Sequence, residues 1–206
     1  MDIKWKEKVS GLSLEHQWNE LYNIKKQQGH PALWAAGNAV QNAKNIIQEM
    51  PRIFKKYRIK TMFDIGCGNV AWMREANFTG VQYTGGDIVN DLVEENKMNF
   101  PDLAFMHFNI VEQIPKRYDL LFLRSVFIHL EIKDVLAAIR NIKQSGSKYI
   151  ILNSHIGVED NKETSCLMLK KRDFMKPPFG LPKPLYSFDE NGHGVCQICL
   201  WRVKDL

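Results

Sequence analysis

The sequence lacks the features of a membrane, secreted or disulfide-bonded protein. No apolar run approaches the roughly 18 residues that a membrane-spanning helix needs. The segment Met1–Lys8 has no apolar core of the kind found in signal peptides. Only four cysteines occur in 206 residues, too few for a disulfide scaffold of this size. We therefore expect a cytoplasmic protein without membrane contact.

A large excess of charge of one sign is also missing. The net charge is +5, and the basic residues are scattered along the chain. The short basic run 170–172 is typical of a solvated loop, so a nucleic-acid partner is not expected. With 45% hydrophobic and 25% charged residues, the composition is that of an ordinary globular protein. The length fits one domain over residues 1–206, and the oligomeric state stays open.

The chain has two of the three glycines of a dinucleotide-binding fingerprint. Gly66 and Gly68 follow a strand-like apolar run, and Trp72 and Met73 stand where the third glycine would be sought. Glycines there allow unusual backbone angles and close approach of a ligand. Asp87 lies 21 residues beyond Gly66, at the end of a second strand-like run. A doubly wound sheet places there the acid that binds ribose hydroxyls, so the pattern predicts a nucleoside site without a pyrophosphate.

Strand-like and helix-like patterns alternate from residue 61 onward. Such alternation predicts an α/β fold, a doubly wound parallel sheet with helices on both faces. Near the end, Asn191-Gly192 lies between two strand-like runs, a strong hairpin signal. The expected strands are 61–65, 81–86, 103–108, 118–124 and 148–153, the expected helices are 90–99 and 132–144, and the hairpin strands lie within 185–190 and 195–203.

The first 58 residues predict helices that cover a core formed by residues 59–206. One apolar helical pattern ends at a glycine-proline break near residue 30, and a second is closed by Pro51. These helices either cover one face of the sheet or form a lid over the ligand cleft. The lid residues would be Trp18, Tyr22, His30 and Trp34.

The stretch 64–68, Asp-Ile-Gly-Cys-Gly, with Asp87 downstream, resembles motif I and the post-strand acid of class I S-adenosylmethionine-dependent methyltransferases. The similarity continues through 105–110, 118–130 and 148–155, and it covers about three quarters of the chain. The resemblance implies a Rossmann-like, seven-stranded, mostly parallel sheet with an antiparallel C-terminal hairpin strand. It also implies S-adenosylmethionine as methyl donor and S-adenosylhomocysteine as product. The sequence has no clustered set of metal ligands, so no metal is expected.

The same resemblance implies roles for individual residues. Gly66 and Gly68 would lie beside the methionine moiety, and Asp87 would take the ribose hydroxyls. The residue after the third strand, usually Asp in the family, would contact the adenine amine. Here it is Asn109, whose amide oxygen can still accept a hydrogen bond. The residues expected around the cofactor are Asp64, Gly66, Cys67, Gly68, Asp87, Ile88, Asn109, Ile110 and Arg124.

Three residues at strand ends are candidates for chemistry. Methyl transfer requires alignment of the acceptor and, for a hydroxyl, removal of its proton. His129 follows the fourth strand and His155 ends the fifth, so either could be the base, with His129 slightly ahead. The alternative for His129 is a residue that only frames the site. Arg124 could bind an anionic acceptor, or it could be exposed to water.

The acceptor is less well specified. The segment 124–127 is not the Asn-Pro-Pro-Tyr of amino-methylases that act on DNA bases. The segments 125–130 and 177–184 resemble a bacterial or viral group of small methyltransferases, often associated with carbohydrates or small molecules. The leading hypothesis is O-methylation of a small-molecule or carbohydrate acceptor, nucleotide-linked or phosphorylated forms included. The alternatives are an RNA or protein methyltransferase and a non-catalytic S-adenosylmethionine-binding module.

A long polar, proline-rich connection, 155–184, precedes the hairpin. Connections of this length are usually functional or disordered. Together with residues 1–40, it is expected to form the acceptor side of the cleft and to be more mobile without ligand.

The cysteines and one histidine have structural interpretations. Cys196 and Cys199, with His193 nearby, could suggest zinc, but residues three apart in a strand point to opposite faces. We therefore expect ordinary strand packing. Cys67 has no obvious base beside it and is expected to pack, and His107 is expected to be structural.

Overall fold

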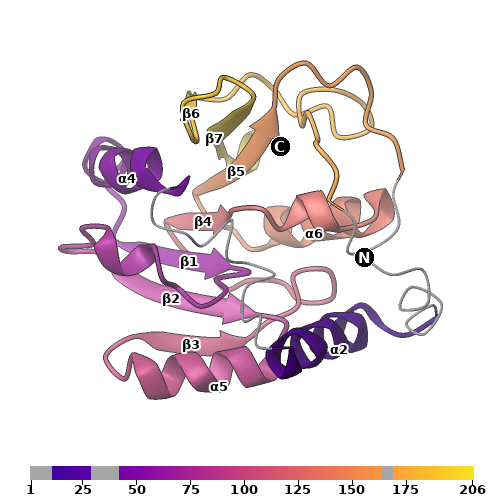
Figure 1. Cartoon of the computed structure of the whole chain (residues 1–206). Coiled ribbons are helices and arrows are strands. Elements are labelled where there is room, and N and C mark those ends of the chain that lie inside the picture. The colour runs from indigo at the N-terminus through magenta and orange to yellow at the C-terminus, as the bar shows by residue number, and fades with distance from the viewer. Residues whose placement is uncertain (1–10, 29–41, 164–168) are drawn as a thin grey trace.

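The fold is built around one seven-stranded sheet in the order β3-β2-β1-β4-β5-β7-β6. It is seen in a computed structural model that describes residues 11–28, 42–163 and 169–206. Figure 1 shows the strands side by side, with helices on both sides of the sheet. The strands are β1 (Thr61–Ile65), β2 (Gln82–Asp87), β3 (Ala104–His107), β4 (Leu120–Leu123), β5 (Tyr149–His155), β6 (Tyr186–Asp189) and β7 (Cys196–Arg202).

The sheet is mostly parallel. Strands β1 to β5 run parallel to one another, whereas β7 is antiparallel to β5 and β6 is antiparallel to β7. The Rossmann-like fold class predicted for the chain is thus confirmed, including its antiparallel C-terminal hairpin strand. Every predicted strand is present, with ends shifted by no more than a few residues.

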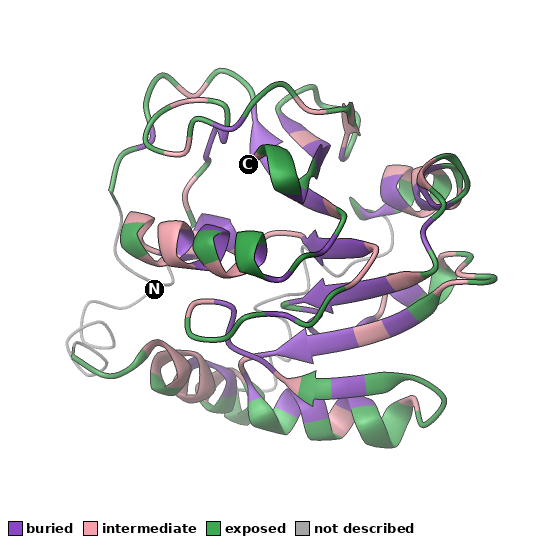
Figure 2. Ribbon diagram, turned by 180° about the vertical axis from the view of Figure 1, so that it is seen from behind, coloured by how far each residue is buried: buried purple, intermediate pink, exposed green. Residues whose placement is uncertain are grey.

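Alternating side chains in the strands build two apolar layers. In β4, Leu120 and Phe122 belong to one core cluster, while Leu121 and Leu123 belong to the other. This alternation follows from the two-residue period of a strand, with both faces covered. The sheet centre is accordingly buried along its length (Figure 2).

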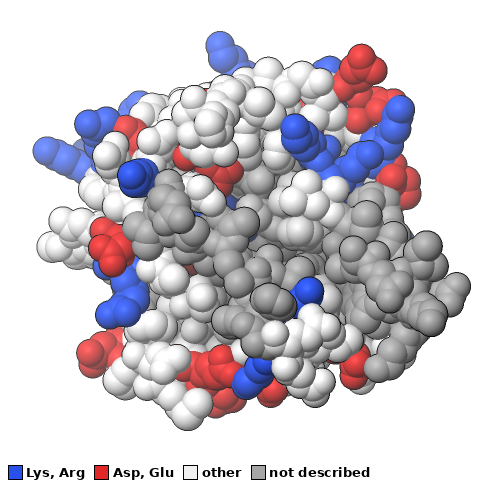
Figure 3. Space-filling model, viewed as in Figure 1, with Lys and Arg blue, Asp and Glu red and all other residues white. Residues whose placement is uncertain are grey.

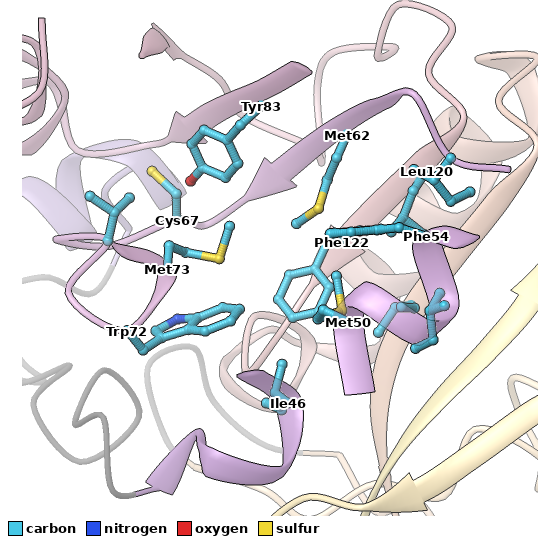
Figure 4. Packing of buried hydrophobic residues seen from close by; sticks show 14 of the residues in the cluster. Ile46, Met50, Phe54, Met62, Cys67, Trp72, Met73, Tyr83, Leu120 and Phe122 are labelled. Carbon is cyan, nitrogen blue, oxygen red and sulfur yellow. The ribbon is translucent and has the colours of Figure 1, made fainter. Parts of the chain in front are cut away.

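One helix covers each layer near the sheet centre. Helix α4 (Lys44–Tyr57) contributes Ile46, Met50 and Phe54 to the first cluster, and they pack toward Phe122 and Met62 of the sheet (Figure 4). Helix α6 (Ile132–Gln144) covers the second cluster with residues spaced three or four apart, as an amphipathic helix does. Its buried residues are Val135, Ala138, Ile139 and Ile142.

The expectation that Pro51 ends the second helix is wrong. Helix α4 continues through Pro51 to Tyr57 and ends at Arg58, whose φ is 53°. Proline removes one helical hydrogen bond and strains the preceding turn. The apolar stripe continues beyond it with Ile53 and Phe54, both buried in the core. Burying two such side chains stabilises the helix by about 1.5–3 kcal/mol each, which offsets the local cost.

Helix α2 (Leu14–Gln27) lies beside α5 (Asn90–Asn99) (Figure 1). The Ser13 side chain accepts a hydrogen bond from the His16 backbone N–H and caps the helix. The Tyr22 hydroxyl donates to Glu95 of α5 at 2.7 Å, which ties the two helices together. The two remaining residues of the predicted lid, His30 and Trp34, lie outside the described residues.

The connection between β5 and β6 is more deeply packed than its composition indicates. Phe174 and Leu181 are buried in the second core cluster. Arg172 is fully buried and donates to the Leu130 carbonyl at 2.8 Å. These contacts hold the proline-rich segment against the sheet rather than leaving it as a solvated loop.

The charged side chains are distributed without a dominant sign. On the face in Figure 3, lysines and arginines alternate with acidic residues around the periphery. Among the residues with described positions, no helix is long and apolar enough to span a bilayer.

Candidate active site

A cavity of about 250 Å³ lies at the carboxyl ends of the central strands. Small-molecule sites occupy roughly 300–1,000 Å³, so its size is close to the lower end of that range. Open α/β sheets bind their ligands at this edge. All nine residues predicted to surround the cofactor line it: Asp64, Gly66, Cys67, Gly68, Asp87, Ile88, Asn109, Ile110 and Arg124.

The loop after β1 is formed by glycines that no other residue could replace without strain. Gly66 has φ of 74°, a left-handed conformation that side chains disfavour. A Cβ at Gly66 would lie 2.4 Å from Val126 Cγ2. The Gly66 N–H donates to the Gly86 carbonyl at 2.7 Å, which holds the loop across the end of β2. The loop thus presents bare backbone to the cavity.

Asp87 ends β2 and is buried beneath this loop. Its carboxylate accepts hydrogen bonds from the Gly68 N–H at 3.0 Å and the Val89 N–H at 3.1 Å. Burial raises the pKa of Asp87, while the backbone hydrogen bonds from Val89, Gly68 and Ile88 act in the opposite direction. Each carboxylate oxygen has a second lone pair, so both oxygens can still accept from a ligand hydroxyl.

Asp64 forms the floor of the cavity. It is 3% exposed, and its carboxylate accepts a hydrogen bond from the Tyr83 hydroxyl at 3.0 Å. Burial raises the pKa of Asp64 to about 7, against the lowering effect of the Tyr83 hydrogen bond. This carboxyl therefore titrates near neutral pH and is sensitive to any nearby charge.

Asn109, after β3, has one unpartnered polar atom. Its Oδ1 accepts a hydrogen bond from the Val111 N–H at 3.0 Å. Its Nδ2 is buried and has no hydrogen-bond partner among the described residues. The oxygen that was expected to accept from a ligand thus already has one partner, and the unpartnered group of the side chain is a donor.

Arg124 lines the cavity, but its guanidinium is already paired. Its Nε lies 2.5 Å from Glu190 Oε1, with side chains 7% and 10% exposed, and its guanidinium lies 5.6 Å from the centre of the Trp72 ring. It also donates to the Asn42 carbonyl at 3.3 Å. The geometry therefore corrects one expectation for Arg124, because its side chain is not exposed to water. Its binding of an acceptor anion stays a prediction.

His129 lines the cavity and lies on the short 3-10 turn Phe127–His129. Its ring makes an edge contact with Trp18 of α2, with ring centres 5.7 Å apart. Its Nδ1 is buried without a hydrogen-bond partner among the described residues. Burial lowers the pKa of His129 to about 4, so the imidazole is neutral at physiological pH.

The structure does not bring His155 into the cavity, which corrects its candidacy as the base. The imidazole Nδ1 of His155 accepts a hydrogen bond from the Arg172 backbone N–H at 3.3 Å, and the His155 backbone N–H donates to the Arg172 carbonyl at 2.7 Å. Its side chain is buried against the proline-rich connection. His155 therefore anchors that connection, and its burial lowers its pKa.

The cysteines are in packing positions. Burial raises the pKa of Cys67 well above its usual value, which disfavours the thiolate. Cys199 packs in the second core cluster, while Ile198 packs in the first, so the strand alternates faces as expected. Within the described part of the chain, no group of three or more His, Cys, Asp or Glu side chains could hold a metal ion.

Sequence reasoning missed several residues of the site. Trp72 lines the cavity, where it had been noted only as a residue in place of a glycine. Ser125 has φ of 59° and donates its N–H to Asn153 Oδ1 at 2.8 Å, which shapes the turn after β4. Glu190 lies 66 positions from Arg124. No local sequence signal identifies Glu190 as the partner of Arg124, although Glu190 directly precedes the expected hairpin turn.

Residues 63–151 match a family described as a methyltransferase domain. No curated protein sequence matches the chain.

Solved structures resemble the chain at low sequence identity. The mitomycin 7-O-methyltransferase aligns with TM-score 0.67 and 13% identity, over 94% of this chain and 62% of its own. Magnesium protoporphyrin IX methyltransferase from Synechocystis PCC 6803, with bound S-adenosylhomocysteine, aligns with TM-score 0.67 and 12% identity, over 92% and 99%. Human N-acetylserotonin methyltransferase, in complex with S-adenosylmethionine, aligns with TM-score 0.62 and 14% identity, over 96% and 61%. The chain thus spans less than two thirds of two of these proteins, and identities this low establish the fold alone.

Residues 63–151 thus resemble a methyltransferase domain, and the chain as a whole has the fold of these methyltransferases. S-adenosylmethionine, which supplies a methyl group from a sulfonium, is bound in the solved structure of human N-acetylserotonin methyltransferase. The residues fit this molecule: Gly66 leaves a cradle that a Cβ would fill, and Asn109 presents an unpartnered donor. Asp87 would hold the ribose, and the loop with Asp64 would hold the methionine end.

Proposed function

We propose that the protein methylates a hydroxyl of a small, largely apolar acceptor. The observation that carries this proposal is the wall around His129. The imidazole lines the cavity and contacts the Trp18 ring. Several other residues that line the cavity are apolar: Leu14, Val126, Ile128, Leu130 and Leu169.

An apolar ring suits this wall better than a sugar. Burying sugar hydroxyls requires hydrogen-bond partners, which apolar side chains do not provide. A phosphorylated or nucleotide-linked acceptor would need a cation, and Arg124 is already paired with Glu190. The named substrates of two structural neighbours, mitomycin and N-acetylserotonin, are small molecules, which supports the same acceptor class.

The weak basicity of His129 favours an acidic hydroxyl. With a pKa of about 4, the imidazole is unprotonated near pH 7 but has a small driving force for removing a proton. A phenol titrates near pH ~10, far below an aliphatic alcohol, so its proton is transferred more readily. We therefore place phenol-like and enol-like hydroxyls ahead of sugar hydroxyls. His129 takes the proton while the wall aligns the acceptor oxygen.

Helix α2 forms part of the acceptor side in this proposal. Leu14 and Trp18 reach the cavity from α2, while Tyr22 is held by Glu95. Leu169, from the β5–β6 connection, is 63% exposed and lines the same cavity. An acceptor would bury this exposed apolar surface on binding.

A methyl-transfer assay tests the proposal. The protein would be incubated with methyl-labelled S-adenosylmethionine and separate panels of phenols, hydroxyindoles, sugar nucleotides, RNA and proteins. We expect label in the phenolic or hydroxyindole panel, and a loss of about 10²–10⁴ in rate for His129→Gln. Label confined to sugar nucleotides, RNA or protein would overturn the acceptor class. Binding of the cofactor without transfer to any panel would favour a non-catalytic module.

A further inference from the structure

The side chain of Asn109 has a fixed orientation. Its Oδ1 accepts the Val111 N–H at 3.0 Å. Rotating the amide by half a turn would place an NH₂ group against that N–H, two donors facing each other. The amide atom of Asn109 that faces the Val111 N–H is therefore the oxygen, and the NH₂ group points the other way.

Every other polar atom of Asn109 is engaged within its own loop. Its N–H donates to Gln113 Oε1 at 2.8 Å, and its carbonyl accepts from Gln113 N at 2.8 Å and Glu112 N at 3.2 Å. The residue is 3% exposed, and Nδ2 is without a hydrogen-bond partner among the described residues. A buried donor left unpaired is costly, so such a group in a ligand site indicates an acceptor on the ligand.

The surroundings of Asn109 suit a flat heterocycle. Ile88, Phe108 and Ile110 line the same part of the cavity, at the ends of β2 and β3. These apolar side chains provide contact surface and no competing hydrogen bond. The adenine of S-adenosylmethionine offers two kinds of polar edge: the 6-amino group, which donates, and the ring nitrogens N1, N3 and N7, which accept.

We propose that the Asn109 side-chain NH₂ donates a hydrogen bond to a ring nitrogen of the cofactor's adenine. This reverses the polarity expected at this position, where an oxygen would accept from the 6-amino group. The assignment rests on S-adenosylmethionine as the cofactor. Asn109 is then a specificity determinant that recognises the adenine by donating a hydrogen bond to it.

Replacing Asn109 by Asp separates the two polarities. The carboxylate has the same shape and keeps an acceptor for the Val111 N–H, so the turn is preserved, but it has no proton to donate. We expect Asn109→Asp to weaken binding of S-adenosylhomocysteine about tenfold or more, measured by calorimetry at pH 8. Tighter or equal binding would overturn the proposal, because a carboxylate accepts from the 6-amino group at least as well as an amide oxygen.

The matched control is Gln113→Glu. It adds the same charge four residues away and keeps the oxygen that accepts from the Asn109 N–H. We expect its affinity for S-adenosylhomocysteine to stay within about twofold of wild type, since exposed charges are screened. A loss equal to that of Asn109→Asp would assign the effect to charge alone and overturn the proposal.

Base analogues test the same contact in the wild-type protein. S-adenosylhomocysteine analogues with carbon in place of N1, N3 or N7 would be titrated in turn. We expect one of the three analogues to bind wild type about tenfold more weakly than S-adenosylhomocysteine does. For that analogue, Asn109→Ala should cause little further loss of affinity, because the two changes remove the same contact. Equal additional losses in Asn109→Ala for all three analogues would overturn the contact. Failure of wild type to bind S-adenosylhomocysteine at all would instead overturn the cofactor assignment.

Discussion

Arg124 and Glu190 form a buried ion pair, with Nε 2.5 Å from Oε1, that joins the end of β4 to the C-terminal hairpin. Glu190 also accepts from the Cys196 thiol at 2.8 Å. The pair lies at the edge of the cofactor cavity, where Arg124 faces Trp72. We expect Glu190 to be a positioning residue that acts on the site through the guanidinium that it holds.

Removing one partner of this pair should destabilise the protein strongly. Glu190→Gln removes the carboxylate that is bonded to the buried Arg124 guanidinium, and we expect a loss of about 3–5 kcal/mol in the free energy of unfolding by urea denaturation. The control is Glu94→Gln, which breaks the exposed pair of Glu94 with Lys97, whose side chains are 65% and 45% exposed. That change should cost less than about 1 kcal/mol. Similar losses in both variants would contradict a special role for the buried pair.

Adding a methyl group at Gly66 should damage the cofactor site. In Gly66→Ala the new Cβ would meet Val126 Cγ2 at 2.4 Å, and φ of 74° would be strained. We expect weaker binding of S-adenosylhomocysteine by calorimetry, and partial recovery in Gly66→Ala with Val126→Ala. Gly80→Ala is the control, since Gly80 has φ of 75° with nothing within 4 Å of its would-be Cβ.

The Gly80 control should lose about 1–2 kcal/mol of stability from backbone strain, with cofactor affinity unchanged. If Gly66→Ala bound S-adenosylhomocysteine as tightly as Gly80→Ala, the loop after β1 would not be a close-contact surface.

The fold could be predicted because its signals are local. The apolar runs of the strands, the alternating helices and the Asn-Gly turn each depend on a few neighbouring residues. Gly66, Gly68 and Asp87 could be placed in one cavity because parallel strands end at the same edge of a sheet. Pro51 shows the limit of local rules, since burial of Ile53 and Phe54 outweighs its helix-breaking tendency.

The roles of polar residues were harder to predict because they depend on partners distant in sequence. Arg124 is a cation at the end of a strand, where it could bind an anion, but Glu190 of the hairpin forms an ion pair with it. His155 ends a strand as an active-site residue would, but Arg172 covers it. For Asn109, the residue type leaves donor and acceptor open, and the hydrogen bond to Val111 decides between them.

Asp64 should couple cofactor binding to proton release. Its pKa of about 7 means that much of it is protonated at pH 6, and a cationic ligand nearby favours the ionised form. S-adenosylmethionine carries an ammonium and a sulfonium, so its binding should release protons at pH 6 and almost none at pH 8.5. Calorimetry in buffers of different ionisation enthalpy measures this release, which Asp64→Asn should abolish.

Tyr83→Phe provides the matched variant for Asp64. The Tyr83 hydroxyl lowers the pKa of Asp64, so its removal should raise that pKa and extend proton release to higher pH. If proton release at pH 6 persisted in Asp64→Asn, another group would be its source.

His129 should be essential for turnover but not for cofactor binding. His129→Gln should lower the rate of methyl transfer by about 10²–10⁴ and leave affinity for S-adenosylhomocysteine within a few-fold. Because burial lowers the pKa of His129 to about 4, the imidazole should not limit activity between pH 5.5 and 8. A rate that falls as pH drops through about 6.5, the ordinary histidine value, and that loses this dependence in His129→Gln would contradict the buried environment.

The same burial should make His129 a source of acid sensitivity. Between about pH 6.5 and 4, the unfolded chain binds a proton at His129 that the folded protein does not, so stability falls as pH falls through this window. The effect approaches about 3 kcal/mol near pH 4, at 1.36 kcal/mol per pKa unit. Asp64 acts in the opposite direction there, because its raised pKa makes the folded state bind the extra proton. Urea unfolding of wild type and His129→Gln at pH 7.5, 6, 5 and 4.5 isolates His129: the wild type should lose stability relative to the variant as pH falls. A constant difference between the two proteins across this range would mean that the imidazole titrates normally, and its assignment as a desolvated base would then be wrong.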